Sequence, residues 1–107
     1  MLFIPLAAIP SQTLNIVLDG QDCTISLYWR QERLYLDLIS NGQAIVVGAI
    51  CENKANVLQT DHLYFKGSLH FFDSEGDSPP RYEGLNYIRW VLVFIAEDED
   101  LPESLRF

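Results

Sequence analysis

Apolar and polar residues alternate with a period of two along three consecutive stretches of this chain, residues 13–18, 23–30 and 33–38. Successive side chains of a β-strand point to opposite faces of a sheet, so each stretch predicts a strand with one apolar face. Asp19-Gly20 separates the first two stretches, and Gln31-Glu32 separates the second from the third. Asp-Gly and two-residue connections are typical of hairpins, so the pattern predicts three consecutive strands of one meander. The apolar faces of its last two strands would be Cys23, Ile25, Leu27 and Trp29, and then Leu34, Leu36 and Leu38.

The meander is expected to continue through a turn at Asn41-Gly42, because Asn and Gly both tolerate positive φ. Residues 44–50 are apolar at nearly every position, which indicates a central strand covered on both faces. Gly48 lies inside this stretch and indicates a β-bulge or a close backbone approach.

The rest of the chain predicts fewer and shorter elements. Residues 62–65 and 68–72 flank Gly67 and predict one bent strand or two short ones, and residues 87–95 predict the last strand. Residues 52–60 do not alternate, so we expect at most one short helical turn or a wide loop there.

These strands predict an all-β fold: a single small antiparallel barrel or sandwich of 6–7 strands, built from a meander. The length of 107 residues favours one domain over residues 1–107. Residues 1–10 would be an extended apolar arm or an edge strand, and residues 96–107 an acidic C-terminal tail. Closure into a barrel would remove the exposed edges of such apolar strands.

Charge and hydropathy exclude several classes of protein. The net charge of −8 argues against nucleic acid as a partner, because phosphate binding depends on Lys and Arg. No apolar run approaches the roughly 20 residues of a membrane-spanning helix, so no membrane partner is expected. The N-terminus lacks the basic start and uninterrupted apolar run of a secretory signal. We therefore expect synthesis in the cytoplasm, where Cys23 and Cys51 would be reduced thiols rather than a disulfide.

A search for catalytic chemistry finds no phosphate loop, zinc-protease motif, paired cysteines or nucleophile elbow, so an enzyme is not expected. Cys23 lies on an apolar strand face and is interpreted as a core residue. His62 and His70 lack further ligands at matched spacing, so no metal or other cofactor is expected.

Asp73, Glu75 and Asp77 alternate like the start of a calcium-binding loop. However, Gly84 stands where the closing glutamate would be needed. This stretch is therefore interpreted as a solvated acidic loop.

Contact surfaces are the better candidates for function. The N-terminal arm offers Phe3, Ile4 and Leu6, and the outer face of the last strand offers Val91, Val93 and Ile95. Nine of the fifteen acidic residues lie within the last 35 residues. They are either a solubilising surface or an electrostatic match to a basic neighbour.

The order of the motifs resembles the phage baseplate plug family of contractile-tailed phages, from about Leu2 to Phe94. The acidic tail from Glu97 departs from the family pattern. The segments that carry the resemblance are Ile4-Pro5-Leu6, Ile9-Pro10-Ser11-Gln12, Leu18-Asp19-Gly20-Gln21, Ile25-Ser26-Leu27-Tyr28-Trp29, Leu34-Tyr35-Leu36-Asp37, Phe65-Lys66-Gly67-Ser68-Leu69 and Pro80-Arg81-Tyr82-Glu83-Gly84-Leu85.

The resemblance implies a non-enzymatic structural protein of the virion, located in the tail baseplate. It would contact hub, spike or tube proteins, form a homo-oligomer in the assembly, and help plug the tail tube until contraction. The alternative is a free-standing all-β binding module for a peptide or a small molecule. Such a module would be monomeric, with a pocket lined by aromatic residues such as Tyr28, Tyr35 and Tyr82.

Overall fold

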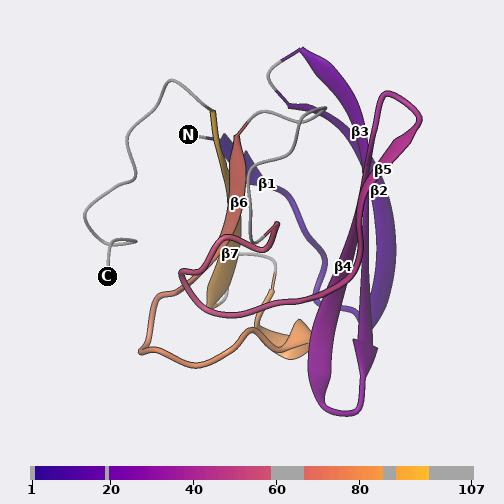
Figure 1. Cartoon of the computed structure of the whole chain (residues 1–107). Helices are drawn as coiled ribbons and strands as arrows, with labels where there is room; N and C mark the ends of the chain where they lie inside the picture. Colours follow the sequence, from indigo (N-terminus) through magenta and orange to yellow (C-terminus); the bar gives the residue numbers. More distant parts are fainter. Residues whose placement is uncertain (1, 19, 59–66, 86–88, 97–107) are drawn as a thin grey trace.

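The computed structural model describes residues 2–18, 20–58, 67–85 and 89–96. These residues form seven antiparallel strands in two sheets that face each other (Figure 1). The all-β prediction is confirmed, and the arrangement is a sandwich instead of a closed barrel among the described residues. The elements are β1 (Leu2–Ile4), β2 (Ser11–Leu18), β3 (Gln21–Arg30), β4 (Arg33–Ser40), β5 (Gln43–Ile50), β6 (Ser68–Asp73), the 3-10 turn η1 (Tyr82–Gly84) and β7 (Trp90–Ile95).

The larger sheet is the predicted meander, in the order β2-β3-β4-β5. Two-residue turns join β3 to β4 and β4 to β5. All four turn residues have positive φ, with values of 51° at Gln31, 62° at Glu32, 51° at Asn41 and 80° at Gly42. This backbone conformation matches the twist of the flanking strands, which keeps the hairpins in register.

The smaller sheet has the order β1-β7-β6, so the first strand of the chain pairs with the last. Leu2 lies opposite Phe94, and Ile4 lies opposite Leu92. Residues Leu2–Ile4 therefore take the edge-strand alternative of the two that the sequence left open for the arm.

The core lies between the two sheets and contains the predicted apolar faces. Side chains of the meander, such as Ile25, Leu27 and Leu36, are fully buried together with Phe71 and Leu92 of the smaller sheet. Alternation placed the meander residues correctly because only one face of the four-stranded sheet is covered, whereas β7 is buried on both faces.

Strand β5 differs from its prediction, which was a central strand covered on both faces. It is instead an edge strand, and Val47 is 71% exposed. The predicted irregularity at Gly48 is present: φ is +69° and the pairing of β4 with β5 shifts nearby. The Asp37 carboxylate accepts the Gly48 N–H at 2.7 Å, so the bulge turns this group away from the ladder.

Residues 52–60 were expected to form at most one short helical turn or a wide loop; the described residues 52–58 contain no helical turn, and the 3-10 turn η1 lies at Tyr82–Gly84. Asn53 and Asn56 form isolated bridges to Phe71 and His70 of β6, because an extended backbone gains hydrogen bonds from that sheet edge. The predicted strand at 62–65, the start of the last predicted strand at 87–88, His62 and the tail from Glu97 lie outside the described residues. No helix in the described residues has the length and apolar character to cross a bilayer.

Candidate interaction surfaces

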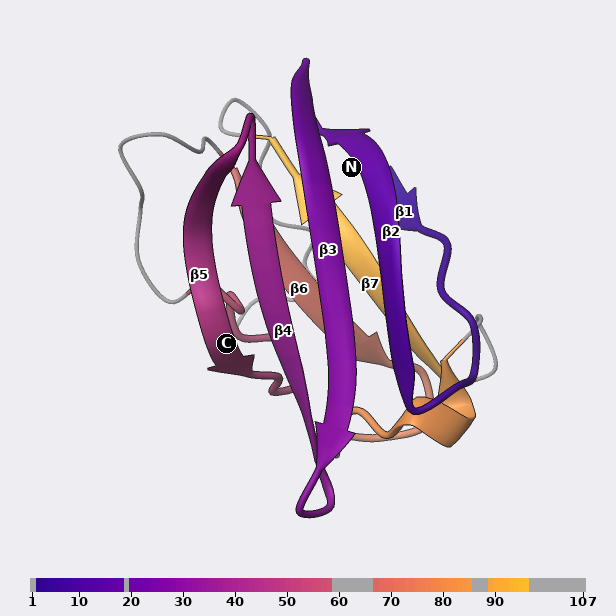
Figure 2. The same cartoon turned by 90° about the vertical axis from the view of Figure 1, so that its right-hand side faces the viewer.

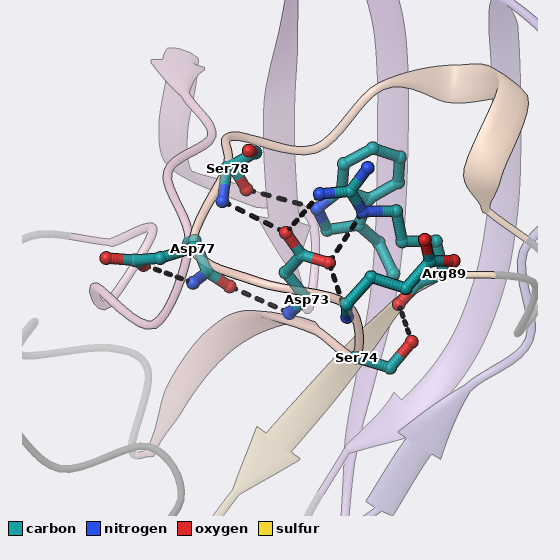
Figure 3. A network of polar contacts seen from close by, with 8 residues as sticks. Asp73, Ser74, Asp77, Ser78 and Arg89 are labelled. Carbon is teal, nitrogen blue, oxygen red and sulfur yellow. Dashed lines mark hydrogen bonds and ion pairs between the residues drawn. The ribbon is translucent and has the colours of Figure 1, made fainter.

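One end of the sandwich is held by a buried carboxylate. The side chain of Asp73, the last residue of β6, is fully buried and accepts two hydrogen bonds from Arg89, at 2.7 Å from Nε and 2.8 Å from Nη2 (Figure 3). It also accepts the backbone N–H groups of Glu75 and Ser78. These hydrogen bonds, the one from Arg89 above all, hold the pKa of Asp73 well below its usual value.

Asp73, Glu75 and Asp77 were predicted to form a solvated acidic loop. This prediction is wrong for Asp73, whose side chain is fully buried. Asp73 lies opposite Trp90 in the pairing of β6 with β7, so Arg89 reaches it from sixteen residues away. Asp77 accepts a hydrogen bond from Asn53 Nδ2 at 2.5 Å. Within the described residues, no group of three acids, histidines or cysteines could hold a metal ion.

Both cysteines of the chain belong to the core. Cys23 and Cys51 are free, buried thiols, and burial raises the pKa of both. The expectation that Cys23 packs in the core is confirmed.

The buried imidazole of His70 makes a hydrogen bond with each of its two ring nitrogens. Its Nδ1 lies 2.6 Å from the Lys54 carbonyl oxygen, and its Nε2 lies 2.9 Å from Ser68 Oγ. A carbonyl oxygen only accepts, so Nδ1 donates and Nε2 accepts from the hydroxyl. Both ring nitrogens are occupied by structural hydrogen bonds, and burial lowers the pKa of His70.

The outer face of the four-stranded sheet is largely polar. Tyr28 stacks on Tyr35 with ring centroids 5.8 Å apart and donates to Asp37 at 3.2 Å. Burial, followed by this hydrogen bond, raises the pKa of Tyr28. Tyr82 instead packs edge-on against Trp29. Trp29 follows Tyr28 in β3, so the two side chains point to opposite faces of the sheet. The aromatic pocket expected of a free-standing binding module is thus not formed by these three tyrosines.

An open hollow of about 590 Å³ lies on the same outer face, near the end of the sheet that carries the β4–β5 turn. Its lining includes Asn15, Val17, Asp22, Thr24 and Ile39. The lining is mixed polar and aliphatic, and Asp22 is its only charged residue, so it offers no set of catalytic groups.

Most of the exposed large apolar side chains lie near the N-terminal strands, with Phe3 on the outer face of the smaller sheet and Val17 on the outer face of the larger one. Six large apolar residues are exposed in the described part of the chain, and four of them lie on β1, β2 or the residues that join them. These four are Leu2, 41% exposed; Phe3, 50%; Ile9, 45%; and Val17, 57%.

The six contact candidates from the sequence fall into different environments. Phe3 is exposed, whereas Ile4 and Leu6 are buried in the main core. Val93 and Ile95 are buried in a small second cluster, and Val91 is partly buried against it.

Leu2, Ile9 and Val17 were not among the contact residues predicted from the sequence. Val17 carried a usable signal, because it is apolar in the polar phase of its alternating strand.

The family model described as "Cyanophage baseplate Pam3 plug gp18" matches residues 1–98 of the chain. No curated protein gives a significant match. The family match covers all seven strands and confirms the resemblance seen in the turn and strand motifs. The family consists of structural baseplate proteins and not of enzymes, and its place is in the virion tail. The chain therefore belongs to the cyanophage baseplate plug family.

Proposed function

We propose that this plug protein acts by contact with hub, spike or tube proteins of the baseplate and helps close the tail tube until contraction. The observation that carries the proposal is the family match over residues 1–98. The fold supports it, because the buried polar groups at Asp73 and His70 are bonded within the chain.

Phe3 is the candidate of the N-terminal arm that fits such a contact best. Half of its side chain is exposed, while its neighbours in the arm, Ile4 and Leu6, are buried in the core. An exposed aromatic side chain on a strand edge is a common anchor of protein interfaces.

The direct experiment is mass spectrometry and cryo-EM of purified virions. The expected result is the chain in the baseplate, in contact with a hub, spike or tube protein across the tail axis. Absence of the chain from purified virions would overturn the proposal.

The arm is tested by a Phe3→Ser variant supplied to a phage that lacks the gene. Deletion of residues 1–10 is a poor test, because it removes two core residues and a strand that pairs with β7. Phe3→Ser should keep the fold and reduce incorporation into tails. Val47→Ser is the matched control, because Val47 is exposed on an edge strand of the other sheet. Equal incorporation of both variants would remove Phe3 from the contact.

The acidic residues predict a salt dependence of assembly. If they face a basic neighbour, salt well above about 0.15 M should slow association, because screening then acts within about 8 Å. Unchanged association kinetics would leave them the role of a solubilising surface.

A further inference from the structure

The two sheets of the sandwich have four edges, and residues of the chain itself cover the edge of β6. Lys54 N–H donates to the Phe71 carbonyl, and Val57 N–H donates to the Leu69 carbonyl, each at 2.8 Å. The side chain of Asn56 accepts the Leu69 N–H, and that of Asn53 accepts the Asp73 N–H. This edge therefore has few groups left for another strand.

Two further edges are protected in ways that are common in natural sheets. The edge of β5 contains the Gly48 bulge, which interrupts its ladder. The edge of β1 is only three residues long, and Pro5 follows it.

The edge of β2 has no such protection. In an antiparallel pair, residues alternate between facing their partner strand and facing away from it. The Asp22 carbonyl accepts a hydrogen bond from Asn41, so the backbone of Asp22 faces away from β2. Val17 lies opposite Asp22, and its own N–H and carbonyl must therefore face outward.

The same holds at every second residue along β2, namely Ser11, Thr13, Asn15 and Val17. The described part of the chain supplies no hydrogen-bond partner to these outward backbone groups. The strand is eight residues long and contains no charged residue, no proline and no bulge. Such an edge is a ready template for a further strand.

The β2 edge also carries apolar residues that are not fully buried. Figure 2 shows β1 and β2 on the same side of the sandwich, joined by the residues between them. Val17 is exposed near the end of this edge, and Leu14 and Ile16 of β2 are only partly buried. A covered interface here would bury apolar surface in addition to satisfying backbone groups.

We propose that the occupant of this edge is the β2 strand of a second copy, paired antiparallel around a two-fold axis at Leu14. In this register Thr13 lies opposite Asn15 of the second copy, and Ser11 lies opposite Val17 of the second copy. All four outward-facing residues of each strand are then paired. The two four-stranded sheets become one continuous sheet, with the Leu14 side chains facing each other on its inner side.

The register favours a second copy, because β2 paired with itself about Leu14 matches every outward-facing residue and brings no like charges together. Two chains with a net charge of −8 repel each other. The repulsion is weakest where the surfaces that meet carry no charged residue. The strand β2 is such a place. A basic partner strand would gain nothing there, because β2 offers it no acid. This inference does not rest on the proposed function, and it is tested on the isolated chain.

The register predicts a specific cross-link. Directly opposed residues of a non-hydrogen-bonded antiparallel pair have Cα atoms about 4.5 Å apart, which a disulfide can span. Leu14→Cys should therefore give a disulfide-linked dimer under mild oxidation. Ile16→Cys is the control, because its two copies would be about 13 Å apart in this register. The native thiols do not interfere, because Cys23 and Cys51 are buried.

A proline variant tests the edge without a new thiol. The Thr13 N–H faces outward, so Thr13→Pro removes no backbone hydrogen bond of the sheet, although it loses the exposed contact of the Thr13 hydroxyl with Ser26 Oγ, and it blocks the dimer. Light scattering during gel filtration should give a dimer for the wild type and a monomer for Thr13→Pro, with circular dichroism confirming that both are folded.

A wild-type chain that stays monomeric up to a concentration of about 1 mM would overturn the proposal. So would equal cross-linking of Leu14→Cys and Ile16→Cys. A monomer whose β2 edge binds a strand of another baseplate protein would also overturn it in favour of that partner.

Discussion

The carboxylate of Asp73 and the guanidinium of Arg89 form a bidentate ion pair that links the end of β6 to the start of β7. The chain leaves the sheet between these two residues, and the pair holds both ends of that excursion together (Figure 3). Arg89 also lies over the ring of Trp90, 4.5 Å from its centroid, and Trp90 Nε1 donates to the Ser78 carbonyl. Backbone, ion pair and aromatic ring thus stabilise the same corner.

Loss of this carboxylate should destabilise the fold. Asp73→Ala leaves Arg89 without its partner and two backbone N–H groups without an acceptor. We expect a loss of about 3 kcal/mol in the free energy of unfolding, measured by urea titration.

Glu75→Ala is the matched control, because it removes an exposed acid from the same loop and should change stability by less than about 0.5 kcal/mol. Similar losses in both variants would contradict the structural role of the ion pair.

Stability should fall as pH falls below neutrality, because of His70. Its pKa in the folded state is lowered from 6.5 by burial, so below that value the unfolded chain binds more protons than the folded one. The free energy of unfolding is therefore highest above pH 6.5 and decreases as pH falls through the folded pKa.

Urea titrations at pH 7.5 and 5.5 measure this loss. His70→Asn can still donate to the Lys54 carbonyl but does not titrate, so the difference between the two pH values should shrink. A difference as large as that of the wild type would assign the effect to other groups. The lowered pKa of Asp73 adds a second loss in the same direction, but only below about pH 4.

Alternation predicted the meander and its buried face, because both depend on residues that are neighbours in the sequence. It failed for β5, because an apolar strand at an edge has the same pattern as one in the middle of a sheet. The difference depends on whether another strand follows on the far side.

The candidate contacts failed in a similar way. Nothing in the sequence distinguishes Phe3, which is exposed, from Ile4, which is buried, until β1 is known to pair with β7. The Asp73–Arg89 pair was missed because it joins two segments that only sheet pairing brings together.

Gly67 should tolerate no side chain. Its φ is +110°, and an added Cβ would lie 2.7 Å from the carbonyl oxygen of Ile95, which is backbone and cannot rotate away. Gly42→Ala is the control, since φ there is +80° but no atom lies within 4 Å of the added Cβ.

Gly42→Ala should lower the free energy of unfolding by about 1 kcal/mol, because of its backbone conformation alone. Gly67→Ala should lower it by about 3 kcal/mol, because the steric clash adds to the cost of the backbone conformation. If Gly42→Ala and Gly67→Ala lowered the thermal midpoint equally, β7 would have to accommodate the added Cβ at residue 67 without loss of stability.

The bulge at Gly48 should depend on a single carboxylate. Asp37 Oδ1 accepts the Gly48 N–H at 2.7 Å and the Tyr28 hydroxyl at 3.2 Å. Asp37→Ala removes the acceptor of both hydrogen bonds, so we expect a loss of about 1.5 kcal/mol in the free energy of unfolding and faster hydrogen exchange of the Gly48 amide. Asp37→Asn keeps an acceptor oxygen and should lose less than half as much. If the Gly48 amide exchanged at the wild-type rate in Asp37→Ala, the bulge would be held by the backbone of β4 and β5 and not by this side chain. The edge of β5 would then be protected without help from Asp37.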